Sequence, residues 1–133
     1  MDSEFLFVYG TLRRDYGLSL MREVADEMEF VATGQVLGQL YDLGDYPGAV
    51  KLDQALTVIK GDVFQLKDST TVFRLLDQYE GEEYRREKVV VDLDTGGQKE
   101  AWIYWFTGPA EEGKRIRVAD YLDYLKNKKD RFL

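Results

Sequence analysis

The sequence predicts an α+β fold in which a small, strongly curved, barrel-like sheet carries two or three flanking helices. Three observations support this. Several stretches are rich in β-branched and aromatic residues, others repeat apolar side chains with a helical period, and glycines recur within the extended stretches, where they favour bulges and bends. The 133 residues, 44% of them hydrophobic, suffice for one compact core, so we expect a single domain over residues 1–133.

The N-terminal part of the chain is predicted to be mostly extended. Residues 5–9 form a short apolar run that ends at Gly10, which is typical of a buried strand. Apolar side chains at helical spacing predict a short helix over residues 18–27. Residues 30–50 are predicted to be extended, with glycine bends and a turn at the sequence DYPG, residues 45–48.

The middle of the chain contains the clearest helix. Before it, residues 56–66 are predicted to form a pair of strands or one strand with a kink at Gly61. Asp68 and Ser69 then provide N-cap chemistry, and Gly81 provides a C′ residue able to adopt the left-handed conformation. The apolar positions between these caps follow a period of 3.6 residues: Val72, Phe73, Leu75, Leu76 and Tyr79.

The C-terminal part is predicted to contain a β-hairpin and a last helix. Residues 86–93 and 100–106 are β-rich and flank the sequence DTGG at residues 94–97, a strong hairpin signature. The last helix is marked by Val118, Tyr121, Leu122 and Leu125. Its final turn carries lysines that complement a helix C-terminus: Lys126, Lys128 and Lys129.

Composition excludes several classes of function. The chain has 25 acidic and 18 basic residues, so we expect no binding to nucleic acid or to an anionic membrane. The start MDSEFLFVYG lacks the basic and long apolar regions of a signal peptide, so we expect a cytoplasmic protein. Cysteine and histidine are both absent, which excludes their catalytic and metal-binding chemistry and leaves proton transfer to Asp, Glu, Tyr or Lys.

The first candidate site is the turn after the first strand. Gly10 lets the backbone turn closely, and free amides of the next residues can make a concave anion site. Thr11 adds a hydroxyl donor, and Arg13 or Arg14 adds a cation. The alternative is an ordinary turn that leaves a strand, because such junctions need the same residue types.

The second candidate site is the end of the helix that precedes Gly81. Glu80 continues an apolar helix at its C-terminus, where the helix dipole opposes ionisation and the neighbouring Tyr79 and Tyr84 can desolvate it. Both effects raise the pKa of a carboxyl group towards the range useful for general base and acid catalysis, although perturbed carboxylates also serve structure. The other nearby carboxylates are interpreted as a solvated face: Asp77, Glu82 and Glu83.

Together these stretches resemble the gamma-glutamylcyclotransferase-like family, also called AIG2-like. The matching sequences are VYGTLR at residues 8–13, YP at residues 46–47 and LDxxEGxxYxRxxVxV at residues 76–91. The resemblance implies a small mixed barrel-like sheet with flanking helices around one cavity. It also implies an enzyme that releases 5-oxoproline from gamma-glutamyl amines or gamma-glutamyl peptides without a metal or organic cofactor.

The resemblance also implies roles for particular residues. Glu80 matches the catalytic glutamate of the family. The family's loop that binds the glutamyl moiety is matched by Tyr9, Gly10, Thr11 and Leu12, and we expect its backbone amides to hold the α-carboxylate. Amides of this loop and the Tyr84 hydroxyl are candidate donors to the oxyanion. The sequence DYGLS at residues 15–19 departs from the polar Asn or His of many relatives, which leaves the amine of the gamma-glutamyl substrate open.

Three functions follow from these residues. The first is a gamma-glutamylcyclotransferase in which Glu80 moves the protons, and the second is a non-catalytic small-molecule binding module on the same fold. The third is a hydrolase that uses Glu80 with Glu82 or Glu83 as a carboxylate pair. Arg86 is open between a role in the site and structural pairing with Glu82 or Asp77.

Overall fold

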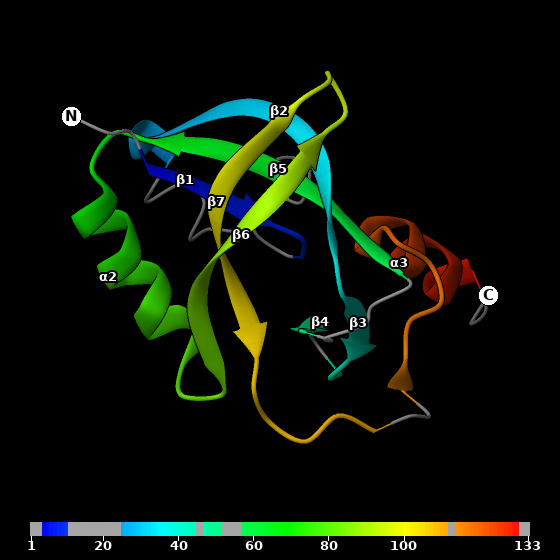
Figure 1. Ribbon diagram of the computed structural model, residues 1–133. Helices are drawn as coiled ribbons and strands as arrows, with labels where there is room; N and C mark the ends of the chain where they lie inside the picture. Colours follow the sequence, from blue (N-terminus) through cyan, green and yellow to red (C-terminus); the bar gives the residue numbers. More distant parts are fainter. Residues whose placement is uncertain (1–3, 11–24, 45–46, 52–56, 112–113, 131–133) are drawn as a thin grey trace.

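The protein forms a closed β-barrel, as seen in a computed structural model that describes residues 4–10, 25–44, 47–51, 57–111 and 114–130 (Figure 1). The barrel strands are β1 (Glu4–Val8), β2 (Met28–Leu37), β5 (Val58–Leu66), β6 (Tyr84–Leu93) and β7 (Gln98–Phe106). Their order around the barrel is β1-β5-β2-β6-β7, and parallel pairing of β7 with β1 closes it, whereas the other pairs are antiparallel. The predicted α+β fold with a barrel-like sheet is confirmed.

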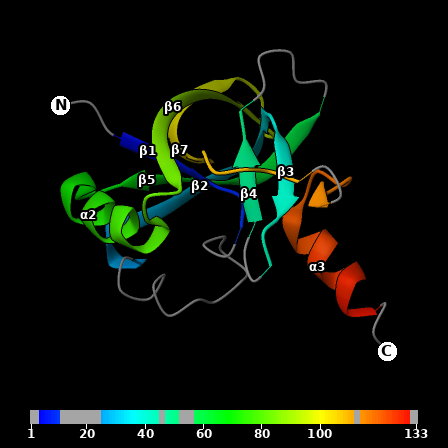
Figure 2. The same cartoon turned by 90° about the horizontal axis from the view of Figure 1, so that it is seen from below.

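The helices and a second small sheet surround the barrel. β3 (Gln39–Asp42) and β4 (Pro47–Val50) form an antiparallel pair, and η1 (Ala25–Glu27) is a single 3-10 turn before β2. Helix α2 (Ser69–Glu80) lies along one side of the barrel and helix α3 (Tyr121–Asp130) lies at the opposite side, as both views show (Figures 1 and 2). Neither of these described helices is long and apolar enough to cross a membrane.

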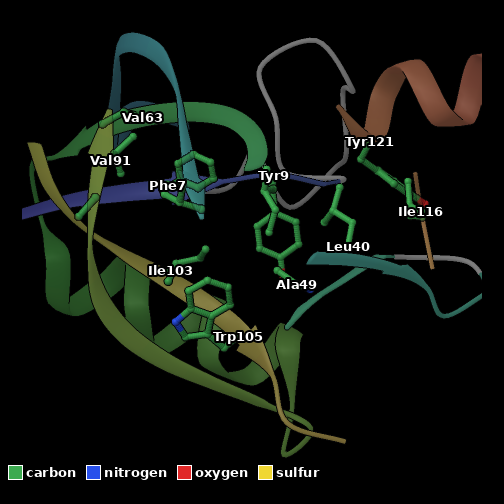
Figure 3. Packing of buried hydrophobic residues seen from close by; sticks show 13 residues of the cluster. Phe7, Tyr9, Leu40, Ala49, Val63, Val91, Ile103, Trp105, Ile116 and Tyr121 are labelled. Carbon is green, nitrogen blue, oxygen red and sulfur yellow. The ribbon is translucent and has the colours of Figure 1, made fainter. Parts of the chain in front are cut away.

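Strand β1 contributes to two hydrophobic clusters at once. Phe7 points into the barrel interior, where it packs in the cluster drawn in Figure 3. Leu6 and Val8 belong instead to the cluster between the barrel and α2. Since successive side chains of a strand point to opposite faces, burial of both faces explains the continuous apolar run of this strand. The α2 side of the second cluster consists of Val72, Phe73 and Leu76.

Helix α2 begins as predicted and ends differently. The Asp68 carboxylate accepts a hydrogen bond from the Thr71 amide at 3.1 Å, which confirms the N-cap. Gly81 has a positive φ of +80°, but its ψ of −170° is extended and not left-handed helical, so the predicted C-cap conformation is wrong. This region of backbone space is essentially restricted to glycine. It turns the chain sharply away from the helix directly after Glu80.

The other predicted elements vary in how well they match. Residues 56–66 contain one strand, β5, and not a pair. Residues 18–24 of the predicted short helix lie outside the described residues, and its end is the 3-10 turn η1. The predicted turn at residues 45–48 is wrong at Pro47 and Gly48, which lie in β4, whereas its first two residues are outside the described chain.

The C-terminal predictions are largely confirmed. Strands β6 and β7 form the expected antiparallel hairpin, with positive φ values of +103° at Gly96 and +81° at Gly97. Helix α3 begins at Tyr121, so Val118 precedes it and is 40% exposed. The reason is that a helical spacing of a few apolar residues does not locate the first turn of a helix.

Candidate active site

Glu80 is the last residue of α2 and lies partly buried beside the barrel. Burial raises the pKa of its carboxyl group from an ordinary 4.5 to about 7, because removal from water disfavours the charged form. The amphipathic helix explains the position, since its apolar face packs on the barrel and carries its last turn inward. The carboxyl group is therefore present in both protonation states near neutral pH.

Tyr9 lies at the end of β1 and joins three parts of the site. Its buried hydroxyl donates to the Tyr104 carbonyl of β7 at 2.6 Å and accepts from the Ala49 amide of β4 at 3.3 Å. Figure 3 shows the Tyr9 ring reaching from β1 towards Ala49. The pKa of Tyr9 is raised well above its ordinary value by burial, then by the charges of Glu80 and Tyr84. Tyr9 and Glu80 are therefore electrostatic neighbours.

Gly10 is required by close packing. A Cβ atom at this position would lie 2.6 Å from Cγ of Pro47, a separation that real Cβ atoms essentially never show. Any other residue would push the end of β1 away from β4. The glycine therefore lets the backbone at Gly10 approach the same strand that Tyr9 contacts.

Tyr84 begins β6 and fixes β4 from the other side. Its hydroxyl donates to the Pro47 carbonyl at 2.8 Å, and its ring packs edge-to-face on Phe106 with centroids 5.5 Å apart. In this structure the hydroxyl proton is engaged by a backbone carbonyl. Donation to a substrate oxyanion would require exchange of that hydrogen bond, because a hydroxyl carries only one proton.

Asp77 is more than a solvated carboxylate. It accepts hydrogen bonds from Arg86 at 3.1 Å and 3.2 Å and from the Tyr104 hydroxyl at 2.5 Å. The alternative in which Arg86 pairs with Asp77 is therefore confirmed. The pKa of Tyr104 is raised by burial and by the hydrogen bond and charge of Asp77; a smaller increase comes from Glu80. The sequence alone leaves open whether Tyr104 lines the site, because no local pattern reveals which strand faces the end of a helix.

The structure brings together four of the predicted site residues. Glu80, Tyr9, Gly10 and Tyr84 meet where α2 ends against β1, β4 and β6. Other predicted positions lie outside the described residues: Thr11, Leu12, Arg13, Arg14, residues 15–19 and Tyr46. Glu82 and Glu83 lie exposed in the turn after α2.

An open depression of about 440 Å³ lies beside the turn after α2. Phe106, which contacts Tyr84, is part of its wall. The remaining lining residues are Asp42, Leu43, Gly44, Glu83, Pro109, Glu111 and Lys114. Within the described part of the chain, no group of three or more acidic side chains is placed to hold a metal ion.

The chemical capacity of the site is proton transfer by a carboxyl group. Burial and, to a smaller extent, the charge of Glu80 raise the pKa values of Tyr9 and Tyr104. The Tyr9 hydroxyl donates to the Tyr104 carbonyl, and the Tyr104 hydroxyl donates to Asp77. These tyrosines therefore do not stabilise an ionised Glu80 by donating to it. A group with a pKa near the working pH is suited to accept and then return a proton.

Comparison with known proteins identifies the family. Residues 6–125 match the family model described as gamma-glutamyl cyclotransferase, AIG2-like. The gamma-glutamylcyclotransferase family protein YtfP of Escherichia coli is 30% identical over 125 residues, which cover 89% of this chain and 96% of YtfP.

Solved structures show the same fold. YkqA from Bacillus subtilis superposes with a TM-score of 0.77 and 25% identity over 97% of this chain, which spans 43% of the longer YkqA chain. An AIG2-like protein from Mus musculus superposes with a TM-score of 0.74 and 20% identity, covering 91% of this chain and 89% of the mouse protein. The chain therefore belongs to the AIG2-like gamma-glutamyl cyclotransferase family.

Proposed function

We propose that this protein is a gamma-glutamylcyclotransferase that converts a gamma-glutamyl amine or gamma-glutamyl peptide into 5-oxoproline and a free amine or amino acid. The observation that carries the proposal is the partly buried Glu80, with a pKa of about 7, next to Tyr9 in a chain of this family. In this proposal Glu80 transfers the protons, and Tyr9, Gly10, Thr11, Leu12 and Tyr84 bind the substrate. The reaction takes place in the cytoplasm.

The reaction requires one carboxyl group to act twice. Ionised Glu80 accepts a proton from the substrate α-ammonium, and the freed amine attacks the γ-carbonyl carbon to form the ring C–N bond. Protonated Glu80 then donates to the departing nitrogen as the original amide C–N bond breaks. Ionised Glu80 next accepts the second proton of the new ring nitrogen and passes it to the released amine, which leaves as an ammonium. No water is consumed, and Glu80 returns to its ionised state. A pKa of about 7 suits both steps, because neither proton transfer is strongly uphill near neutral pH.

Anchoring of the glutamyl group is expected to supply a large part of the acceleration. Attack is intramolecular, and effective molarities of well-oriented reactions reach on the order of 10⁵ M or more. The family resemblance assigns this task to the loop that starts at Gly10, and Gly10 itself packs closely on Pro47. Amide groups of that loop would hold the α-carboxylate while the α-amine folds back on the side chain.

The decisive test is detection of 5-oxoproline. The full chain is incubated with a panel of gamma-glutamyl amines and gamma-glutamyl dipeptides, and the product is quantified by mass spectrometry. We expect product from at least one member and its loss in Glu80→Gln. Absence of product across a broad panel would contradict the proposal. Saturable binding of a gamma-glutamyl ligand without turnover would instead identify a binding module.

A further inference from the structure

The Asp77–Arg86 ion pair is partly exposed, yet several contacts fix its geometry. The guanidinium Nε and Nη2 atoms donate to the two different carboxylate oxygens at 3.1 Å and 3.2 Å, a bidentate geometry. The same guanidinium lies over the Phe73 ring at 3.9 Å and near the Trp102 ring at 4.9 Å. The side chains of Arg86 and Asp77 remain 28% and 48% exposed. Arg86 is therefore held in one position by contacts on several sides.

This pair lies within electrostatic reach of Glu80. Asp77 and Glu80 are three residues apart on α2, so their side chains are neighbours on one face of the helix. The Tyr104 hydroxyl lies near all three groups. Besides burial, which raises its pKa most, Asp77 and Glu80 raise this pKa and Arg86 lowers it. The pKa of Tyr104 therefore depends on both carboxylates and on the guanidinium.

The groups around Glu80 come from four elements. Asp77 comes from its own helix, Tyr9 directly follows β1, and Tyr104 comes from β7. Strand β6 provides Tyr84 and Arg86. Among these described groups Arg86 carries the positive charge. Burial is the cause of the raised pKa of Glu80, and an unpaired cation beside that carboxyl group would lower the pKa by stabilising the ionised form.

We propose that Asp77 and Arg86 are positioning residues of the candidate site and act as one electrically neutral unit beside Glu80. Asp77 holds the guanidinium on the Phe73 and Trp102 rings and also holds the Tyr104 proton. Glu80 is thereby kept from pairing with Arg86 and stays available for proton transfer. The inference deepens the proposed function, on which the catalytic meaning of this arrangement rests.

The hydrogen bond to Asp77 also fixes the direction in which the Tyr104 hydroxyl donates its proton. Its proton is directed to Asp77 at 2.5 Å, so its oxygen can only accept hydrogen bonds from other neighbours. An acceptor beside Glu80 suits the N–H groups of a substrate amine and not an oxyanion.

The test measures the titration of Glu80 directly. Carboxyl ¹³C NMR follows Glu80 in the substrate-free protein, in Asp77→Asn, in Arg86→Met and in the double variant. We expect Asp77→Asn to lower the Glu80 midpoint and Arg86→Met to raise it, each by about 0.5–1 pH unit, since one removes an anion and the other a cation. The double variant is expected to return close to the unmodified protein.

Control variants separate this effect from general surface charge. Lys88 and Glu100 form another ion pair with a separation of 3.3 Å, and Lys88 also lies near Trp102. Lys88→Met and Glu100→Gln should leave the Glu80 midpoint unchanged. Arg86→Lys keeps the charge and should stay within about 0.3 pH unit of the unmodified protein. If Arg86→Met fails to fold, Asp77→Asn decides alone: a lowered Glu80 midpoint supports the inference, and an unchanged or raised midpoint overturns it.

The two single variants distinguish the proposed neutral unit from a purely structural ion pair. Midpoints that move in opposite directions in the two single variants support the inference. Midpoints that stay fixed or move together, in proteins whose NMR spectra remain dispersed, would show a purely structural ion pair and overturn it. Failure of the proposed function is seen separately, as lack of 5-oxoproline, because the titration uses no substrate. In an active protein, the acidic limb of kcat/KM should follow the NMR midpoints.

Discussion

The two ends of helix α2 each carry a carboxylate in an opposite environment. Asp68 at the N-terminus is exposed and accepts from both the Thr71 hydroxyl and the Thr71 amide, which lower its pKa. Glu80 at the C-terminus is partly buried, and burial raises its pKa to about 7. The same functional group is thus a structural cap at one end and, in the proposed function, the group that transfers protons at the other. Solvation and hydrogen-bond donors decide which role it takes.

The largest expected difference between the two carboxylates is in activity. Glu80→Gln should lower kcat/KM by about 10²–10⁴-fold, the usual contribution of general acid–base catalysis, because the amide cannot exchange protons. The rate of 5-oxoproline formation measures this. Glu82→Gln, which changes an exposed carboxylate two residues away, is the matched control and should keep full activity. Equal activity of both variants would remove Glu80 from the mechanism.

The next effect is the pH dependence of catalysis. The proposed mechanism requires ionised Glu80, so kcat/KM should fall about tenfold per pH unit below a midpoint near 7. Initial rates between pH 4.5 and 9 measure the midpoint, with a substrate whose own groups do not titrate between pH 5 and 8. A profile that stays flat down to pH 4.5 would show that ionisation of Glu80 does not limit the reaction.

Glu80 should also make the stability of the protein decrease as the pH rises, whereas activity increases over the same range. A folded-state pKa of about 7, above the ordinary 4.5, means that the contribution of Glu80 is fully present below pH 4.5 and is lost as the pH rises through 7. Relative to the unmodified protein, Glu80→Gln should therefore be more stable at pH 8.5, by at most about 3 kcal/mol, and similar near pH 4. Urea unfolding at both pH values tests this, and a pH-independent difference would contradict it.

The smallest effect is expected at the N-terminus of the helix. Asp68→Ala removes the acceptor for the Thr71 amide and should lower the melting temperature by a few degrees at pH 7 without changing kcat/KM. Since the folded-state pKa of Asp68 is lowered, its stabilisation is present above the ordinary 3.8 and is lost as the pH falls below it. Thermal melts at pH 7 and pH 3 measure this. A change in kcat/KM would mean that the two helix ends are coupled.

Local elements were predictable where nearby residues decide the conformation. The helix between Asp68 and Gly81 and the hairpin around residues 94–97 depend on caps, periodicity and glycines that lie within the elements themselves. The turn predicted at Pro47 and Gly48 was wrong for the opposite reason. These residues pair with β3, and the Pro47 carbonyl accepts from Tyr84, so partners distant in sequence override a local turn preference.

The candidate site divides in the same way. By itself the sequence determined that proton transfer needs a group other than histidine or cysteine, and that Glu80 ends an apolar helix before a glycine. Only the tertiary structure decided that this carboxylate lies beside Tyr9 and Tyr104, and that Asp77 holds Arg86. The physical reason is that a pKa and an ion pair depend on distances across β1, β6, β7 and α2. Such distances exist only once the barrel has closed.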